Sequence, residues 1–104
     1  MQPIRRYTLL ALLAALFSLP LIAGCAGMPL QQMSDARQAV RAAERAGAEQ
    51  HAPELLDEAR ALVKAASENL HKGEYRDARD EAELARDKAM EARRISEEAK
   101  GKQP

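Results

Sequence analysis

Aromatic residues and cysteine are scarce in this chain of 104 residues, which contains no Trp, one Phe, two Tyr and one Cys. A single cysteine excludes an intramolecular disulfide. The shortage of aromatic rings removes the stacking platforms on which proteins bind single-stranded nucleic acid. The 16 basic and 16 acidic residues cancel, so the chain also lacks the positive charge of a nucleic-acid-binding protein. We therefore expect no nucleic-acid partner.

The one long apolar run lies near the N-terminus and is too short to cross a membrane. It extends from Leu9 to Ile22, about 14 residues, whereas a transmembrane helix needs roughly 20. Arg5 and Arg6 precede it, and small residues follow it. A basic start, a short apolar run and a small-residue end are typical of a cleavable export signal. We predict a signal peptide over residues 1–24.

The end of this segment resembles a lipobox, the motif of bacterial lipoproteins. Cys25 follows two aliphatic and two small residues, Leu21, Ile22, Ala23 and Gly24. Small side chains suit the peptidase that cuts before the cysteine, and the thiol suits the transferase that adds diacylglycerol. The resemblance implies that Cys25 is the first mature residue, carrying diacylglycerol and an N-acyl chain. We expect no other cofactor.

The residues after Cys25 bear on which membrane holds the anchor. In lipoproteins of this kind, an Asp directly after the cysteine usually causes retention in the inner membrane, whereas Ala26 and Gly27 follow here. Two or more acyl chains hold a protein stably on a bilayer. The expected location is therefore the periplasmic face of the outer membrane.

The mature chain consists largely of strong helix formers, and we expect an all-α fold. We predict a lipidated tether over residues 25–32, an alanine-rich helical domain over 33–100 and a flexible tail over 101–104. Ser34 is a suitable N-cap for a first helix over about 34–48. This helix either docks on the following ones in a loose three-helix bundle or stays extended.

Two longer helices are predicted on either side of Gly73. Pro53 suits the first turn of a helix over about 53–72, and Gly73 suits the position just after its end. A further helix over about 74–100 completes an antiparallel hairpin, with Ser96 interrupting its small-residue stripe. The predicted packing seam consists of small and apolar residues at helical spacing: Leu56, Ala59, Val63, Ala66, Leu70, Tyr75, Ala78, Ala82, Ala85, Ala89 and Ala92.

The turn and the seam resemble two known families. The spacing of Gly73, Tyr75, Ala78, Ala82 and Ala85 resembles the turn and second helix of a tetratricopeptide repeat, although no second copy appears at a period of 34. A longer pattern over roughly residues 30–100 resembles the family called domain of unknown function 4398 (DUF4398). Its residues are Ala36, Val40, Ala43, Ala52, Pro53, Leu56, Ala59, Leu62, Ala66, Leu70, Gly73, Tyr75, Ala78, Ala82 and Ala85. The resemblance implies a short proteobacterial lipoprotein or a segment ahead of an OmpA-like domain, with no assigned activity.

Residues for catalysis or metal binding are not grouped in a recognisable pattern. His51 and His71 are the only histidines, and no metal-binding spacing surrounds them. The serines show no arrangement with His and Asp that would make a nucleophile. We therefore predict that the protein is not an enzyme and holds no metal.

Taken together, these features predict a non-enzymatic outer-membrane lipoprotein that presents a helical hairpin in the periplasm. The hairpin would serve protein–protein interaction or envelope organisation, with a protein partner or self-association offsetting a small apolar core. One alternative is a structural linker resembling the murein lipoprotein, which is attached covalently to peptidoglycan through a C-terminal Lys. We rank this alternative lower because the last residues here are Lys102, Gln103 and Pro104. Another is a small accessory subunit of an envelope complex. Direct contact with peptidoglycan has no support among these residues.

Overall fold

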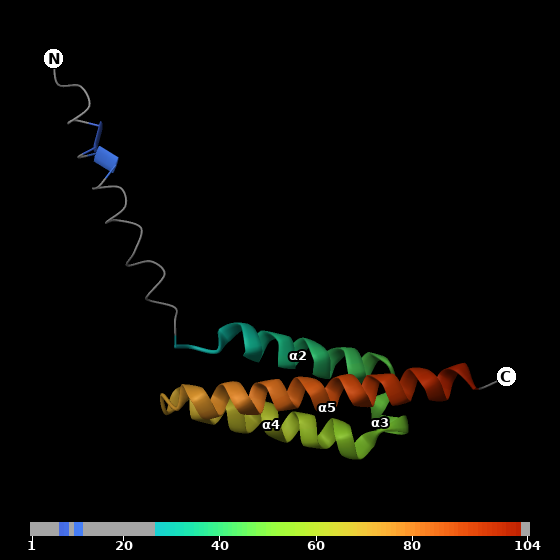
Figure 1. Cartoon of the computed structure of the whole chain (residues 1–104). Helices are drawn as coiled ribbons and strands as arrows, with labels where there is room; N and C mark the ends of the chain where they lie inside the picture. The colour runs from blue at the N-terminus through green and yellow to red at the C-terminus, as the bar shows by residue number, and fades with distance from the viewer. Residues whose placement is uncertain (1–6, 9, 12–26, 103–104) are drawn as a thin grey trace.

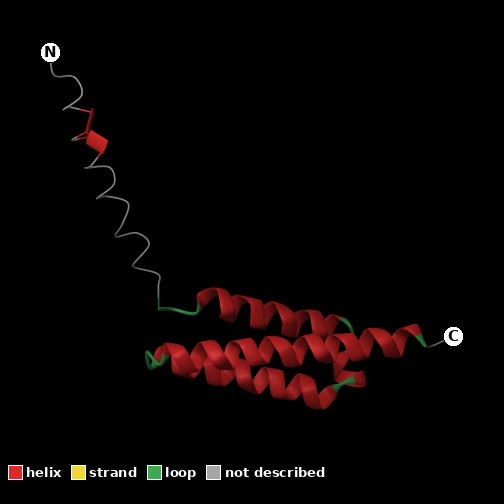
Figure 2. Cartoon of the chain, in the orientation of Figure 1, coloured by secondary structure: helices red, strands yellow, loops and turns green. Residues whose placement is uncertain are grey.

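The structure, a computed structural model, describes residues 7–8, 10–11 and 27–102 (Figure 1). The predicted lipobox and lipidation site, Leu21 to Cys25, lie outside the described residues. The described chain contains four helices and no strand, which confirms the all-α prediction (Figure 2). The helices are α2 (Leu30–Arg45), α3 (Ala48–His51), α4 (Pro53–His71) and α5 (Tyr75–Gly101).

Helix α5 lies between α2 and α4 and packs against both of them (Figure 1). Helices α4 and α5 form the predicted antiparallel hairpin, and α2 runs parallel to α5. The two ends of α2 show this direction. A Cβ built on Gly27, just before α2, would lie 3.5 Å from the Tyr75 ring at the start of α5. At the other end, a Cβ on Gly47 would lie 3.3 Å from Lys100 Cε. The first helix therefore docks, and the result is a three-helix bundle.

Helix α2 begins at Leu30, four residues before the predicted start. The buried Pro29 occupies the N-cap position, and its carbonyl accepts a hydrogen bond from the Met33 amide at 3.0 Å. The prediction of Ser34 as N-cap, and of a tether reaching residue 32, is therefore wrong. Ser34 lies exposed inside the helix, where its hydroxyl accepts a hydrogen bond from Gln38 Nε2 at 3.2 Å.

The end of the first helix also differs from the prediction, because α2 stops at Arg45. Gly47 follows in the left-handed conformation with φ 92°, and the chain then forms the short helix α3. Residues with a Cβ rarely adopt this backbone conformation, so glycine allows the chain to bend there. The predicted helix over 34–48 therefore merges the end of α2 with the start of α3.

Local chemistry accounts for the ends of α4 and the turn into α5. Pro53 is the first residue of α4, as predicted, and needs no hydrogen-bond partner for its nitrogen there. At the other end Gly73 has φ 80°. The Glu74 amide donates to the Asn69 carbonyl at 2.9 Å, and the Gly73 amide donates to the Leu70 carbonyl at 3.1 Å. These two bonds form a Schellman motif, which reverses the chain into the hairpin.

The core is built mainly from alanine, with few large side chains. Five alanines of α5 are fully buried: Ala78, Ala82, Ala85, Ala89 and Ala92. Four of them pack in two clusters: Ala82 and Ala85 lie with Met33, and Ala89 and Ala92 lie with Val40 and Leu56. The partly buried Val63 packs against both clusters and makes the core continuous. Alanine permits close approach of the helices, so the core gains contact density rather than large apolar area.

Candidate functional site

The predicted seam lies inside the bundle. Every alanine of the seam is fully buried, as is Leu56, whereas Val63, Leu70 and Tyr75 are partly buried at its edges. Ser96 does not interrupt the stripe as expected. It is fully buried, and its hydroxyl donates to the Ala92 carbonyl at 2.7 Å, so it packs as one more small residue. Because α2 and α4 already cover the seam, it offers no free surface to a partner.

Polar contacts join α4 and α5 across the hairpin. Asn69 Nδ2 of α4 donates to both carboxylate oxygens of Glu81 of α5 at 2.8 Å, in a partly buried position. Lys88 Nζ pairs with Glu58 Oε2 at 3.1 Å. These contacts set the register between α4 and α5, since sliding one helix by a turn would break them.

Arg60 of α4 is the centre of an ion-pair group that the sequence did not reveal. Its guanidinium lies 2.8 Å from Glu49 of α3, 3.7 Å from Glu44 of α2 and 3.6 Å from Asp57. The hydrogen bond to Glu49 raises the pKa of Arg60 above its ordinary value. All four side chains are at least a third exposed, so each pair contributes little stability, about 0–1 kcal/mol.

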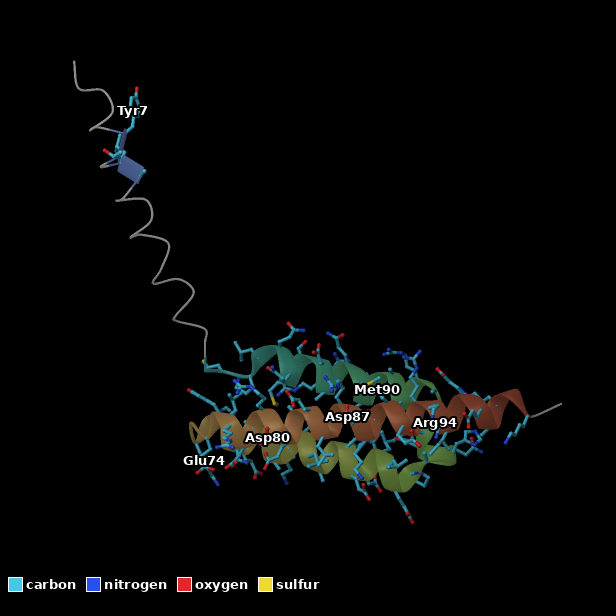
Figure 3. The ribbon with its side chains drawn as sticks, viewed as in Figure 1. Tyr7, Glu74, Asp80, Asp87, Met90 and Arg94 are labelled. Carbon is cyan, nitrogen blue, oxygen red and sulfur yellow. The ribbon has the colours of Figure 1, made fainter. Side chains whose placement is uncertain are left out.

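The outer surface of α5 carries an acidic ridge, which we define by seven exposed residues at helical spacing. They are Asp77, Asp80, Leu84, Asp87, Glu91, Arg94 and Glu98. Figure 3 shows Asp80, Asp87 and Arg94 following one another along α5. Arg94 donates to Glu91 and Glu98, at 3.0 and 2.7 Å, and these hydrogen bonds raise the pKa of Arg94. The hydrogen bond from Arg94 in turn lowers the pKa of Glu91.

A groove of about 600 Å³ lies between α2 and α5 on another side of the bundle. The alanines Ala39 and Ala42 and the exposed Met90 contribute its apolar surface. Four arginines and one aspartate carry its charge: Arg41, Arg45, Arg86, Arg93 and Asp35. Arg86 and Arg93 are paired with Asp87 and Glu97, so the positive charge of this groove comes from Arg41 and Arg45, in contrast to the acidic ridge of α5. We refer to it as the basic groove.

The described part of the chain contains no candidate metal site. Residues 7–8, 10–11 and 27–102 contain no group of three or more His, Cys, Asp or Glu that could hold a metal ion. His51 lies in α3 and His71 at the end of α4, on opposite ends of the hairpin. Within the same residues, no helix combines the length and the apolar character that crossing a membrane requires.

These features define a small helical bundle with an alanine core and charged outer faces. Residues 31–103 match the family described as domain of unknown function (DUF4398), which is most of the chain. The chain therefore belongs to the DUF4398 family, as the sequence pattern predicted. No curated protein and no solved structure matches it. The tetratricopeptide-like character of the turn at Gly73 stays a prediction.

Proposed function

We propose that this protein is a non-enzymatic lipoprotein of the outer membrane, anchored through Cys25 and presenting its helical bundle in the periplasm. The observation that carries the proposal is the lipobox ending at Cys25, five residues before the start of α2. A DUF4398 bundle whose outer faces carry charged side chains is consistent with a binding or organising role. The covered seam leaves the outer faces as the contact surfaces for a protein partner or a second copy.

Lipidation is tested by mass spectrometry of the chain purified from bacterial membranes. We expect a mature protein beginning at Cys25 with the added mass of diacylglycerol and one further acyl chain. Cys25→Ser should prevent acylation and leave the precursor uncut, while the neighbouring Ala26→Ser should still be acylated. A chain without acyl mass, or a Cys25→Ser variant processed normally, would refute the anchor.

The interaction role is tested by crosslinking from the outer faces in living cells. A photoreactive residue at Leu84, exposed on the acidic ridge of α5, should yield a defined adduct with one partner or with a second copy. The same residue at Ala61, exposed on α4, is the control for nonspecific capture. No defined adduct from Leu84, or identical adducts from both sites, would count against a binding role. Muropeptides carrying this chain covalently would instead favour the linker alternative.

A further inference from the structure

The outward face of α2 carries three arginines along the second half of the helix. Five exposed residues lie on this face at a spacing of three or four, in the order Leu30, Ser34, Arg37, Arg41 and Arg45. The three arginines follow one another at intervals of four residues, and like charges at this spacing disfavour a helix. An arrangement that works against the helix suggests that the charges serve an external contact.

The arginines of this face have no acidic partner within the bundle. Across residues 27–102, Arg37, Arg41 and Arg45 form no ion pair, whereas Arg86 pairs with Asp87 at 3.0 Å and Arg93 with Glu97 at 2.7 Å. Arg41 and Arg45 also line the basic groove, so the unpaired charge extends from the outward face of α2 toward α5. We call this face with the groove beside it the basic face.

We propose that the basic face lies on the anionic phospholipid headgroups of the bilayer that carries the anchor. This inference rests on the proposed lipidation of Cys25. Leu30 follows Cys25 by five residues, and an extended chain of that length spans at most about 17 Å. The start of α2 is thereby held near the headgroups, where electrostatic attraction acts over about 8 Å at physiological salt.

The chemistry of the face fits phospholipid headgroups. Arginine binds phosphate through two parallel hydrogen bonds, which makes it well suited to this contact. Met28 and Leu30, 44% and 58% exposed, lie at the anchored end of α2, where apolar side chains can enter the interface. A helix lying flat along the surface would bring all three arginines to the same depth as Leu30.

The charge of the other helices favours this orientation of the bundle. Helix α2 carries three arginines against Asp35 and Glu44, a net charge of +1. Helix α4 carries four acidic residues against Arg60 and Lys64, a net charge of −2. Since α5 lies between them, attraction of α2 and repulsion of α4 both turn the basic face toward an anionic bilayer (Figure 1).

The contact is tested with the full acylated chain reconstituted in vesicles. Because acylation occupies Cys25, Ser34→Cys provides a single free thiol for a fluorophore on the basic face, and Ala61→Cys provides one on α4. A paramagnetic lipid headgroup quenches fluorophores close to the bilayer surface. We expect strong quenching at position 34 in vesicles of phosphatidylglycerol mixed with phosphatidylcholine. Quenching should be weak at position 61, and weak at both positions in phosphatidylcholine alone.

Charge variants distinguish an effect of the basic face from an effect of the net charge of the protein. Each arginine near an anionic surface contributes roughly a fivefold preference, so replacing Arg37, Arg41 and Arg45 by Gln should reduce the docked-to-free ratio roughly a hundredfold. Replacing Lys64, Lys88 and Arg94 by Gln removes the same charge from α4 and α5 and should leave quenching at position 34 unchanged. Circular dichroism of both triple variants checks that the helices remain folded.

The outcomes distinguish this inference from the proposed function on which it rests. Acylated protein that floats with the vesicles, yet shows equal quenching at positions 34 and 61, would overturn the docking of α2 and leave the anchor intact. Docking of α2 would also be overturned if both triple variants lost quenching equally, or if position 34 were quenched as strongly in vesicles of phosphatidylcholine alone. Purified chain without acyl mass would overturn both the anchor and the docking.

Discussion

Replacing Ala85 by Leu tests whether the helices depend on close approach through alanine. Ala85 is fully buried in a cluster with Met33 and Ala36 of α2 and with Ala66 of α4, so an isobutyl side chain in place of its methyl group meets atoms of both neighbouring helices. Overpacking of this kind costs about 1–3 kcal/mol. A fold of the 76 described residues from 27 to 102 has a free energy of unfolding of about 4–11 kcal/mol. The substitution should therefore remove a substantial part of the stability.

The assay is thermal unfolding followed by far-ultraviolet circular dichroism. For a domain of this size each kcal/mol lowers the unfolding temperature by about 4–8 °C, so Ala85→Leu should lower it by about 4–24 °C. Ala61→Leu makes the same change at an exposed position of α4 and should alter stability by less than about 0.5 kcal/mol. An Ala85→Leu protein with the same unfolding temperature as the wild type would show that α5 is not closely packed between α2 and α4.

Three further predictions use the same unfolding assay. Leu56→Ala removes a fully buried side chain and should destabilise the bundle by about 2–5 kcal/mol, and a loss below about 1 kcal/mol would contradict its place in the core. Gly73→Ala should cost about 1–2 kcal/mol because φ is 80°, in the left-handed region. A Cβ there meets no atom within 4 Å, so the cost comes from the backbone alone, and Asn, which adopts this conformation more readily, should be tolerated better than Ala. Arg94 lowers the pKa of Glu91 in the folded state. The pair therefore stabilises the fold at pH values above 4.5, the ordinary pKa of the glutamate, and this stabilisation is lost as the pH falls through the lowered pKa. Acid destabilisation should be shallower in Glu91→Gln, and equal pH profiles would contradict this linkage.

The hairpin was predictable from the sequence because its boundaries depend on local chemistry. Pro53 starts a helix and Gly73 ends one for reasons that involve only neighbouring backbone groups. The predicted helices over 53–72 and 74–100 each match the observed bounds to within one residue at either end. The spacing of the small residues likewise identified the face of α5 that is buried, because helical periodicity requires no knowledge of the partner.

The start of α2 was mispredicted because tertiary packing decides it. Ser34 is a better N-cap than Pro29 by intrinsic preference, yet Met33 is 2% exposed and packs against Ala82 and Ala85 of α5. A helix that includes Met33 places this side chain in the core, and burying a methionine stabilises the fold more than one N-cap hydrogen bond does. Ser96 was misjudged for a related reason, since a hydroxyl bonded to its own helix is no larger than a small apolar group in a tight seam.

The ion-pair group at Arg60 and the basic face could not be recognised from the sequence, because both depend on which helices become neighbours. Arg60 lies 11 residues from Glu49, a separation at which no helical rule pairs two charges. The arginines of α2 look like any solvated helix face until the structure of residues 27–102 shows that they form no ion pair. Only the arrangement in space separates charges that pair internally from charges left for a partner.

The covered seam determines what kind of binding this protein can perform. Small buried residues hold α2, α4 and α5 together, and within residues 27–102 the exposed large apolar side chains are four: Met28, Leu30, Leu84 and Met90. Four scattered side chains bury too little area to drive a tight association by the hydrophobic effect alone. Under the proposed function, recognition must then come mainly from the basic face and the acidic ridge. Contacts between exposed charges weaken as salt screens them, so binding through either surface should be strongly dependent on ionic strength, whereas attachment through the acyl chains of Cys25 should not.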